Sequence, residues 1–299
     1  MAFGNIGPVD VIRSDRVKCG LTDPELGVRM PRRAVTMMQD ILDLDRYPID
    51  QPQSASCRAL VAACAAALAR DGMFNLAGFL RPGAREVAIA ELRPVIDRSS
   101  FTHRRMHNIY FKKEIAGLAP DHPALRQVET INHTICGDQI PHSLIKRIYD
   151  WPAMAAFLAQ TMEKPALFPM ADQLAGANVM EYRDGEALNW HFDRSEFTTT
   201  LLLQAAEQGG EFEYRTDLRS SSDPNYAGVA ALLEGRDPQA RTLKLSAGTL
   251  NVFKGVNTAH KVTTVRGPTP RIIAVLSYYE HPGLMFTPEE RMGFYGRAS

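Results

Sequence analysis

The sequence lacks a surplus of charge of either sign. Its 299 residues include 34 Lys and Arg and 34 Asp and Glu, so the formal net charge is zero. Proteins that bind nucleic acid commonly carry a basic surplus or a basic patch that is visible in the sequence. No such surplus and no charged tail is present here, and we therefore expect no nucleic-acid partner.

Cysteine is scarce, and its four copies are scattered. Cys19, Cys57, Cys64 and Cys136 form no Cys-x-x-Cys pair. This usage is typical of free thiols in a reducing compartment rather than of a disulfide framework. The first residues also lack a basic region followed by an apolar run, as a secretory signal would have. The sequence therefore predicts a cytoplasmic location.

Long apolar runs, internal repeats and low-complexity linkers are also lacking. The alanine-rich stretch 59–69 is bounded by Arg58 and Arg70 and is too short to cross a membrane. A hydrophobic fraction of 45% is ordinary for a globular protein with a sizeable core. We therefore expect one compact unit over residues 1–299, with no membrane partner.

Residues 1–170 are expected to form a helical or mixed region that supports the core of the protein. Ser54 or Ser56 can cap a helix that continues to Arg70 and ends at Gly72. The elements predicted in this region are helices over 32–45, 54–70, 84–96, 141–149 and 151–162, and a strand over 73–80.

Two stretches of this region are candidates for substrate contact. Arg104 or Arg105 can hold a carboxylate or phosphate of a substrate, or the two can form a solvated basic patch. Residues 108–111 are strand-like, and 117–140 is a long connecting segment. Long connecting segments commonly carry functional residues, so this one can form part of a pocket mouth.

Short β-type runs separated by glycine-containing turns dominate residues 171–282, where we expect the core. Strands are predicted over 178–182, 188–192, 197–204, 211–214, 249–253, 260–265 and 272–279. The polar insertion 215–242, with a short helix over 226–233, is expected to be a lid or a contact in a homodimer. The tail 283–299 can fold back over a pocket.

The most informative motif is His191-Phe192-Asp193, with a distant His260. Residues i and i+2 of a strand lie on the same face, so an imidazole nitrogen and a carboxylate oxygen can reach one metal ion. His-x-Asp alone occurs by chance in many chains. The surrounding pattern of strands and the later histidine make it specific.

The order of these elements resembles the Fe(II)/2-oxoglutarate-dependent dioxygenases. The resemblance covers roughly residues 174–282 and includes the Tyr-x-x-Gly segment at Tyr182, the Gly-Gly-Glu-Phe segment at Gly209, Gly-x-Leu-x-Val-Phe before His260, and Arg271 on the next strand. It implies a mainly β protein with flanking helices, whose core is a double-stranded β-helix (jelly-roll, cupin-like) at 171–282. More loosely, the chain resembles the branch that acts on free amino acids and similar small molecules.

The resemblance implies three metal ligands, His191, Asp193 and His260. Two histidines and one carboxylate on one face of an octahedral Fe(II) leave positions for 2-oxoglutarate and O2. In the halogenases of this branch a glycine replaces the aspartate. Asp193 is present here, which favours oxygenation.

An arginine is needed for the far carboxylate of the keto acid, because its planar fork matches a carboxylate. Arg266 and Arg271 both follow His260. We favour Arg271, which begins a strand, over Arg266, which lies beside a probable Gly-Pro turn. Asn178 and Tyr182 share one strand face and are also predicted to contact the keto acid.

Two residues are predicted to contact the substrate. By resemblance to the amino-acid branch, Asp172 can hold an amino group. Arg194 follows Asp193 directly and can meet an anionic group, or it can form a salt bridge at the rim.

The leading hypothesis is a hydroxylase that acts on a C–H bond of a small polar metabolite, such as a free amino acid, with succinate and CO2 as co-products. One alternative is a protein or peptide hydroxylase. Another is a non-catalytic barrel that binds a small molecule and has kept its metal site.

Overall fold

The computed structural model describes residues 37–299. The expected helix over 32–45 lies partly outside this range, and Cys19 lies wholly outside it. Within the range, the α-helices are α1 (Met38–Ile41), α2 (Ala55–Asp71), α3 (Pro82–Ser99), α4 (Leu144–Asp150), α5 (Pro152–Thr161), α6 (Tyr226–Leu233) and α7 (Pro288–Tyr295), with 3-10 helices η1 (Pro123–Leu125) and η2 (Gly137–Gln139). No helix among these residues combines the length and the apolar character that crossing a bilayer requires.

The strands form two facing sheets and one small ribbon, and every pairing is antiparallel. The strands are β1 (Met73–Leu76), β2 (Phe101–His107), β3 (Val128–Ile135), β4 (Phe168–Pro169), β5 (Ala177–Tyr182), β6 (Leu188–His191), β7 (Thr198–Gln204), β8 (Phe212–Arg215), β9 (Arg241–Leu243), β10 (Leu250–Phe253), β11 (Ala259–Val262), β12 (Arg271–Leu276) and β13 (Tyr278–Tyr279). The large sheet has the order β1-β10-β7-β12-β5-β3-β2, and the small sheet has the order β6-β11-β8-β9. This is the jelly-roll core with flanking helices that the sequence predicts.

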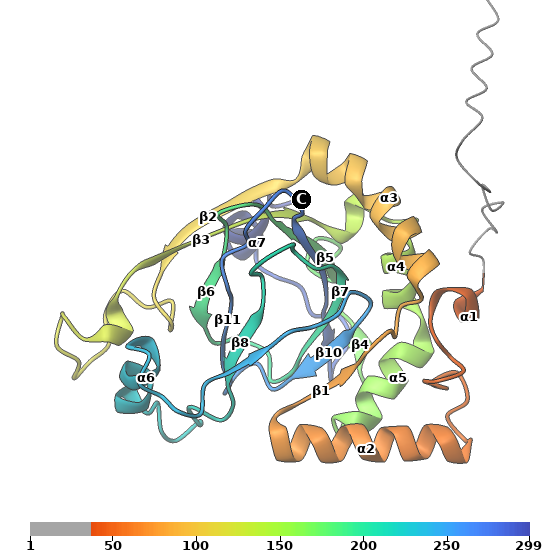
Figure 1. The fold of residues 1–299 in the computed structure, drawn as a ribbon, viewed down its shortest axis with the longest axis horizontal. Coiled ribbons are helices and arrows are strands. Elements are labelled where there is room, and N and C mark those ends of the chain that lie inside the picture. The colour runs from red at the N-terminus through yellow and green to blue at the C-terminus, as the bar shows by residue number, and fades with distance from the viewer. Residues whose placement is uncertain (1–36) are drawn as a thin grey trace, which may run out of the picture. The chain divides into compact units, whose positions relative to one another are not determined.

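Helices α2 to α5 cover the outer face of the large sheet (Figure 1). Helix α2 begins as expected, because Ser54 Oγ accepts a hydrogen bond from Cys57 N at 3.0 Å, and it ends at Gly72, whose φ is +73°. Apolar side chains of these helices pack with the outward-facing side chains of the strands, among them Leu92, Ile148, Leu158, Val179, Leu201 and Ala274. The inner face of the sheet is thereby left for the site.

Helix α1 is shorter than the helix predicted over 32–45. After Ile41 the chain becomes extended, and Leu42 forms an isolated bridge with Leu80. The amide of Asp43 then donates to the carbonyl of Phe79 at 2.9 Å. Backbone pairing with Phe79 and Leu80, which follow β1, therefore replaces the hydrogen bonds of the longer helix that the apolar pattern predicts.

Strands β2 and β3 were not predicted, and both belong to the large sheet. The sequence predicts a strand-like run only at 108–111 and a long connecting segment over 117–140. On β3 the inward side chains include Thr130, Asn132 and Thr134, which are polar although buried. Because both faces of these strands carry polar residues, the apolar alternation that marks a strand is missing.

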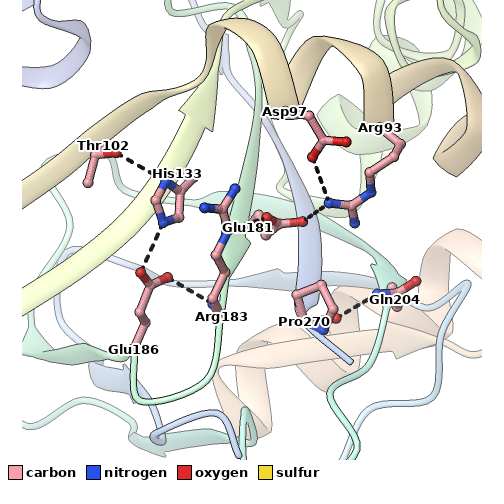
Figure 2. A network of polar contacts seen from close by, with 9 residues as sticks. All are labelled: Arg93, Asp97, Thr102, His133, Glu181, Arg183, Glu186, Gln204 and Pro270. Carbon is pink, nitrogen blue, oxygen red and sulfur yellow. Dashed lines mark hydrogen bonds and ion pairs between the residues drawn. The ribbon is translucent and has the colours of Figure 1, made fainter. Parts of the chain in front are cut away.

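A polar network fixes the large sheet to α3 just before the chain enters β6 (Figure 2). Glu181 on β5 is almost fully buried and accepts hydrogen bonds from Arg93 of α3 at 2.5 Å and from Arg183 at 2.7 Å. His133 on β3 lies 2.9 Å from Glu186, in the β5–β6 turn, and 3.1 Å from Thr102. A buried carboxylate needs such partners, and here they hold the turn that leads to β6.

The insertion and the tail both return to the core. In the insertion, α6 packs beside η1, and its Val229 and Leu232 share an apolar cluster with Phe192 of the His-x-Asp motif. In the tail, α7 lies beside β2 (Figure 1). Directly after this helix, a side-chain carbon at Gly296 would meet the ring of Phe101 on β2. Both segments therefore border the region in which the predicted site residues lie.

Candidate metal centre

The structure brings His191, Asp193 and His260 together on the small sheet. His191 ends β6, and His260 lies directly opposite it on β11. The Nε2 atoms of the two histidines lie 3.4 Å and 3.5 Å from the carboxylate oxygens of Asp193, and one potential ligand atom from each residue lies within 4.8 Å of the others. These three side chains are separated by up to 69 positions in the sequence, yet each offers a potential ligand atom to one point.

Both histidines are held in the tautomer that a metal requires. The Nδ1 atom of His191 lies 2.8 Å from the carbonyl oxygen of Asn189, and that of His260 lies 3.0 Å from the carbonyl oxygen of Thr258. A carbonyl oxygen only accepts, so each Nδ1 carries the hydrogen and donates it. Each Nε2 therefore faces Asp193 and the shared point, and the backbone contact fixes the ring orientation.

Burial and charge set the protonation of the cluster. Burial lowers the pKa of His260 to about 4, so this imidazole is neutral at neutral pH. Burial by itself raises the pKa of Asp193, but His260, His191 and the Thr198 hydroxyl together hold that pKa well below its usual range. An anionic carboxylate with two nitrogen donors is a donor set that fits a divalent iron ion.

Thr198 holds the Asp193 carboxylate and Gly255 leaves space for it, and the sequence did not predict either role. Thr198 Oγ1 donates to Asp193 Oδ2 at 2.5 Å, and Asp193 N donates to the carbonyl oxygen of Gly255 at 3.1 Å. A side-chain carbon at Gly255 would lie 2.6 Å from Asp193 Oδ2 and 2.5 Å from Thr198 Oγ1. Position 255 therefore needs glycine because the carboxylate occupies the space of a side chain. The only sequence signal was the Lys254-Gly255 turn.

We expect Gly255→Ala to weaken divalent-metal binding by about 10- to 100-fold, the range that follows loss of a group that orients a ligand. The added methyl group displaces the carboxylate and breaks its bond with Thr198. Isothermal titration of the metal-free protein with Fe(II) under anaerobic conditions measures this. Gly83→Ala is the control, since a side-chain carbon at Gly83 meets no atom within 4 Å. Equal affinities of the two variants would show that Gly255 does not position the carboxylate.

Arg271 is a buried cation without an anion among the described residues. Its side chain is 3% exposed, its Nε donates to the carbonyl oxygen of Gly210 at 3.0 Å, and one terminal nitrogen has no hydrogen-bond partner. Burial lowers its pKa to about 10, so it stays charged at neutral pH. An unpaired buried guanidinium is costly, and a ligand carboxylate is the group that it fits.

Tyr182 lies beside Arg271, whereas Arg266 lies at the surface. Tyr182 faces Arg271 in the β5–β12 register, with the guanidinium carbon 5.9 Å from the phenol ring centre. Arg266 is exposed, and its backbone pairs with Gln208 at the turn. Of the two arginines considered from the sequence, only Arg271 is directed into the barrel interior beside a predicted partner.

Asn178 shares the face of Tyr182, as expected, but protein groups already engage its amide. Its Oδ1 accepts a hydrogen bond from the Tyr295 hydroxyl at 3.0 Å, and its Nδ2 donates to the carbonyl oxygen of Leu174 at 2.5 Å. Tyr295 is the last residue of α7. Asn178 therefore helps to hold α7, and its contact with a keto acid stays a prediction.

The two residues predicted to bind the substrate also contact α7. Asp172 is fully buried, and its carboxylate accepts hydrogen bonds from Leu174 N, Phe286 N and Arg291 Nε at 2.8 to 3.0 Å. Arg194 pairs with Glu290 at 2.5 Å, and its side chain is 67% exposed. The predicted substrate contacts of both residues stay predictions, because in the structure each one anchors the C-terminal helix.

Removing the partner of a buried carboxylate is strongly destabilising, so Arg291→Met should lower the free energy of unfolding by about 2–4 kcal/mol. Asp172 keeps its two backbone donors but loses its only described cation. Chemical denaturation monitored by circular dichroism measures the change. Arg236→Met is the control, because Arg236 pairs with Glu234 at an exposed site. A loss no larger than that of the control would show that α7 is not held by this ion pair.

Comparisons with known proteins show the family and the fold. The sequence matches the model of a protein family described as Halogenase D over residues 58–284, most of the chain. No curated protein sequence matches it.

Several solved structures share the fold. The non-heme alpha ketoglutarate dependent epimerase SnoN from nogalamycin biosynthesis is 16% identical with a TM-score of 0.50, and the alignment covers 74% of this chain and 83% of SnoN. AviO1 from Streptomyces viridochromogenes Tue57 is 17% identical with a TM-score of 0.50, over 73% of this chain and 93% of AviO1. At such identities the likeness shows the fold alone. The chain belongs to the Halogenase D family, and its fold is one that it shares with a 2-oxoglutarate-dependent non-haem enzyme.

Proposed function

We propose that this protein is an Fe(II)- and 2-oxoglutarate-dependent oxygenase that hydroxylates a C–H bond of a small polar metabolite, such as a free amino acid. Succinate and CO2 are the co-products. The observation that carries the proposal is the combination of the His191, Asp193 and His260 cluster with Arg271, a buried guanidinium that lacks an anion among the described residues.

The residues of the chain supply binding and orientation. When bound, Fe(II) with 2-oxoglutarate activates O2 for attack on an unactivated C–H bond. His191, Asp193 and His260 would hold the metal ion, and Arg271 would pair through its fork with the far carboxylate of the keto acid. Tyr182 limits how the guanidinium can turn. Burial of Arg271 keeps water from this contact, which strengthens it.

Hydroxylation is favoured over halogenation by Asp193. The family description names a halogenase, and in halogenases of this kind a glycine in place of the aspartate frees a metal position for halide. Here the carboxylate is present, anionic and held by the Thr198 hydroxyl, while the backbone amide of Asp193 donates to the carbonyl oxygen of Gly255. A third protein donor at that position leaves it unavailable to a halide ion.

The positions of helices α6 and α7 around the interior favour a small substrate. Helix α7 lies beside β2, and α6 packs beside η1 near the back of β6 (Figure 1). Such enclosure suits a small molecule better than a peptide chain. A homodimer and a cytoplasmic location stay predictions, although Cys57, Cys64 and Cys136 are free thiols, as expected, and the structure buries all three.

The decisive experiment is an anaerobic titration of the purified protein with Fe(II) and then with 2-oxoglutarate, followed by visible spectroscopy. We expect the charge-transfer band of an iron-chelated keto acid. Iron binding without the band would exclude 2-oxoglutarate as cosubstrate. Incubation with candidate metabolites, O2 and chloride, followed by mass spectrometry, then separates a product that is heavier by one oxygen from a chlorinated one.

A further inference from the structure

The residue between two of the candidate metal ligands points away from the metal centre. Phe192 separates His191 from Asp193, and its ring is buried in an apolar cluster with residues of α6 and η1. Ala259, the neighbour of His260, belongs to the same cluster. Because side chains alternate along an extended chain, this cluster lies behind the three candidate ligands. Packing at the back of the small sheet can therefore set how precisely the ligand atoms converge.

Arg219, in the polar insertion 215–242, covers the ring of Phe192. Its guanidinium carbon lies 3.9 Å from the centre of that ring and 5.8 Å from the centre of the Tyr110 ring. Tyr110 also stacks on Phe192 with a centroid distance of 5.5 Å, and its hydroxyl donates to the carbonyl oxygen of Pro224 at 2.8 Å. A guanidinium is attracted to an aromatic face, more strongly where water is excluded. The ring of Phe192 is thus held by the insertion and by a tyrosine that is itself bonded to the insertion.

Arg219 also holds the turn between β10 and β11. Its Nε donates to the carbonyl oxygen of Val256 at 2.8 Å. Directly before it, the amide of Leu218 donates to the carbonyl oxygen of Asn257 at 3.0 Å. Two successive residues of the insertion are therefore hydrogen-bonded to two successive carbonyl groups of this turn.

The residues on either side of these two carbonyl groups contact the candidate ligands. The carbonyl oxygen of Gly255 accepts a hydrogen bond from the amide of Asp193 at 3.1 Å, and that of Thr258 accepts one from His260 Nδ1 at 3.0 Å. A shift of the turn would therefore move the backbone of one ligand and rotate the ring of another. One side chain of the insertion thus joins the segments that carry all three candidate ligands.

The chemistry of Arg219 suits this double contact. It is half-buried and forms no ion pair with any residue in the described range 37–299. Burial lowers its pKa, but a guanidinium stays charged at neutral pH. Its planar group can stack by its face while Nε–H donates within its plane, which a lysine ammonium cannot do. Arg215 of the same insertion differs, because Asp237 engages it at 3.0 Å.

We propose that Arg219 is a positioning residue of the metal centre, which braces Phe192 against the β10–β11 turn and keeps the three candidate ligands converged on one point before a metal ion binds. This inference rests on the proposed function and extends the metal site to the insertion 215–242. A site whose ligands are already in place needs no rearrangement on binding, so loss of the brace should appear as weaker metal affinity.

The test is the affinity of the metal-free full-length protein for Fe(II), measured by anaerobic calorimetry well below the thermal midpoint of each variant. We expect Arg219→Met, which keeps an unbranched side chain but removes both contacts, to weaken binding about 10-fold, as for loss of a group that orients a ligand. Arg219→Lys should restore part of the loss, because a cation over the ring remains, and it keeps the comparison possible if Arg219→Met does not fold.

A double-mutant cycle shows whether Arg219 acts through Phe192. Phe192→Leu keeps the position apolar but removes the ring on which the guanidinium stacks. Because the two side chains share one contact, the loss of Fe(II) affinity in the double variant should be smaller than the product of the two single losses. A full product would show that the two residues act independently and would overturn the brace.

The matched control is Arg215→Met, which removes a largely buried cation of the same insertion from Asp237. It should lower the thermal midpoint without changing the Fe(II) affinity. Unchanged affinity of Arg219→Met, or equal losses for Arg219→Met and Arg215→Met, would overturn the inference. Iron binding without a charge-transfer band on addition of 2-oxoglutarate contradicts the proposed function instead, and the affinities still decide the role of Arg219. A wild-type protein that binds no Fe(II) would overturn both.

Discussion

Replacing Arg271 with glutamine is expected to raise the 2-oxoglutarate concentration for half-saturation by about 100-fold, while Fe(II) still binds. The change removes a charge-assisted, bidentate contact, which is worth about 2–3 kcal/mol. The three predicted metal ligands are untouched, because Arg271 lies on β12 of the large sheet and the two histidines lie on the small sheet. The anaerobic charge-transfer band, titrated with 2-oxoglutarate at saturating Fe(II), measures the effect.

The same substitution separates a ligand-binding role from a structural one. In the described structure the buried guanidinium has one backbone partner and no anion, so losing its charge should not lower the thermal midpoint of the ligand-free protein. Arg266→Gln is the control for charge, since Arg266 is exposed. If Arg266→Gln weakens 2-oxoglutarate binding and Arg271→Gln does not, the assignment of the anchor is wrong.

His260→Ala is expected to weaken Fe(II) binding by more than about 100-fold, beyond what loss of a supporting hydrogen bond causes. The substitution leaves one nitrogen and one carboxylate donor in place of three donors. It also empties space between the rings of Phe212 and Phe253, which lie 5.6 Å and 4.8 Å from the His260 ring. Some loss of stability is therefore expected, and folding must be checked by circular dichroism.

A second variant keeps this prediction independent of stability. His260→Gln retains most of the volume but removes the imidazole donor, and it should bind Fe(II) as poorly as His260→Ala. His281→Ala is the control, because His281 is exposed and is not a member of the metal cluster. Calorimetry of the metal-free proteins under anaerobic conditions provides the comparison. Tight Fe(II) binding by both His260 variants would show that this residue is not a ligand.

Much of the core was predictable because its signals are local. Strands β5, β7 and β10 and helices α2 and α6 agree with their predictions to within a residue or two, since period-two apolar patterns, caps and glycines act over a few residues. The grouping of His191 and Asp193 needed only the alternation of a strand. The partner of that pair, His260, was named through a family resemblance rather than through a spacing rule.

The inner face of the large sheet was not predictable in the same way. Strands β2 and β3 present polar side chains to the interior, so hydrophobic alternation did not reveal them. The pairing partner of a single buried residue, such as Asp172, was equally hard to predict. Its sequence position suggested a substrate contact, yet Arg291, more than a hundred residues later, engages it. No local pattern shows which distant residue will meet a buried carboxylate.

The amino-acid sequence by itself indicated a histidine and an aspartate with strand spacing and an arginine at the start of a later strand, and through the family resemblance it indicated the distant His260 and a jelly-roll core. Tertiary structure alone decided which charges remain available to ligands. Arg194 and Asp172 have protein partners, whereas the described structure provides no anion for Arg271. The physical reason is that charge pairing depends on distances between segments far apart in the chain, which antiparallel register and helix docking set.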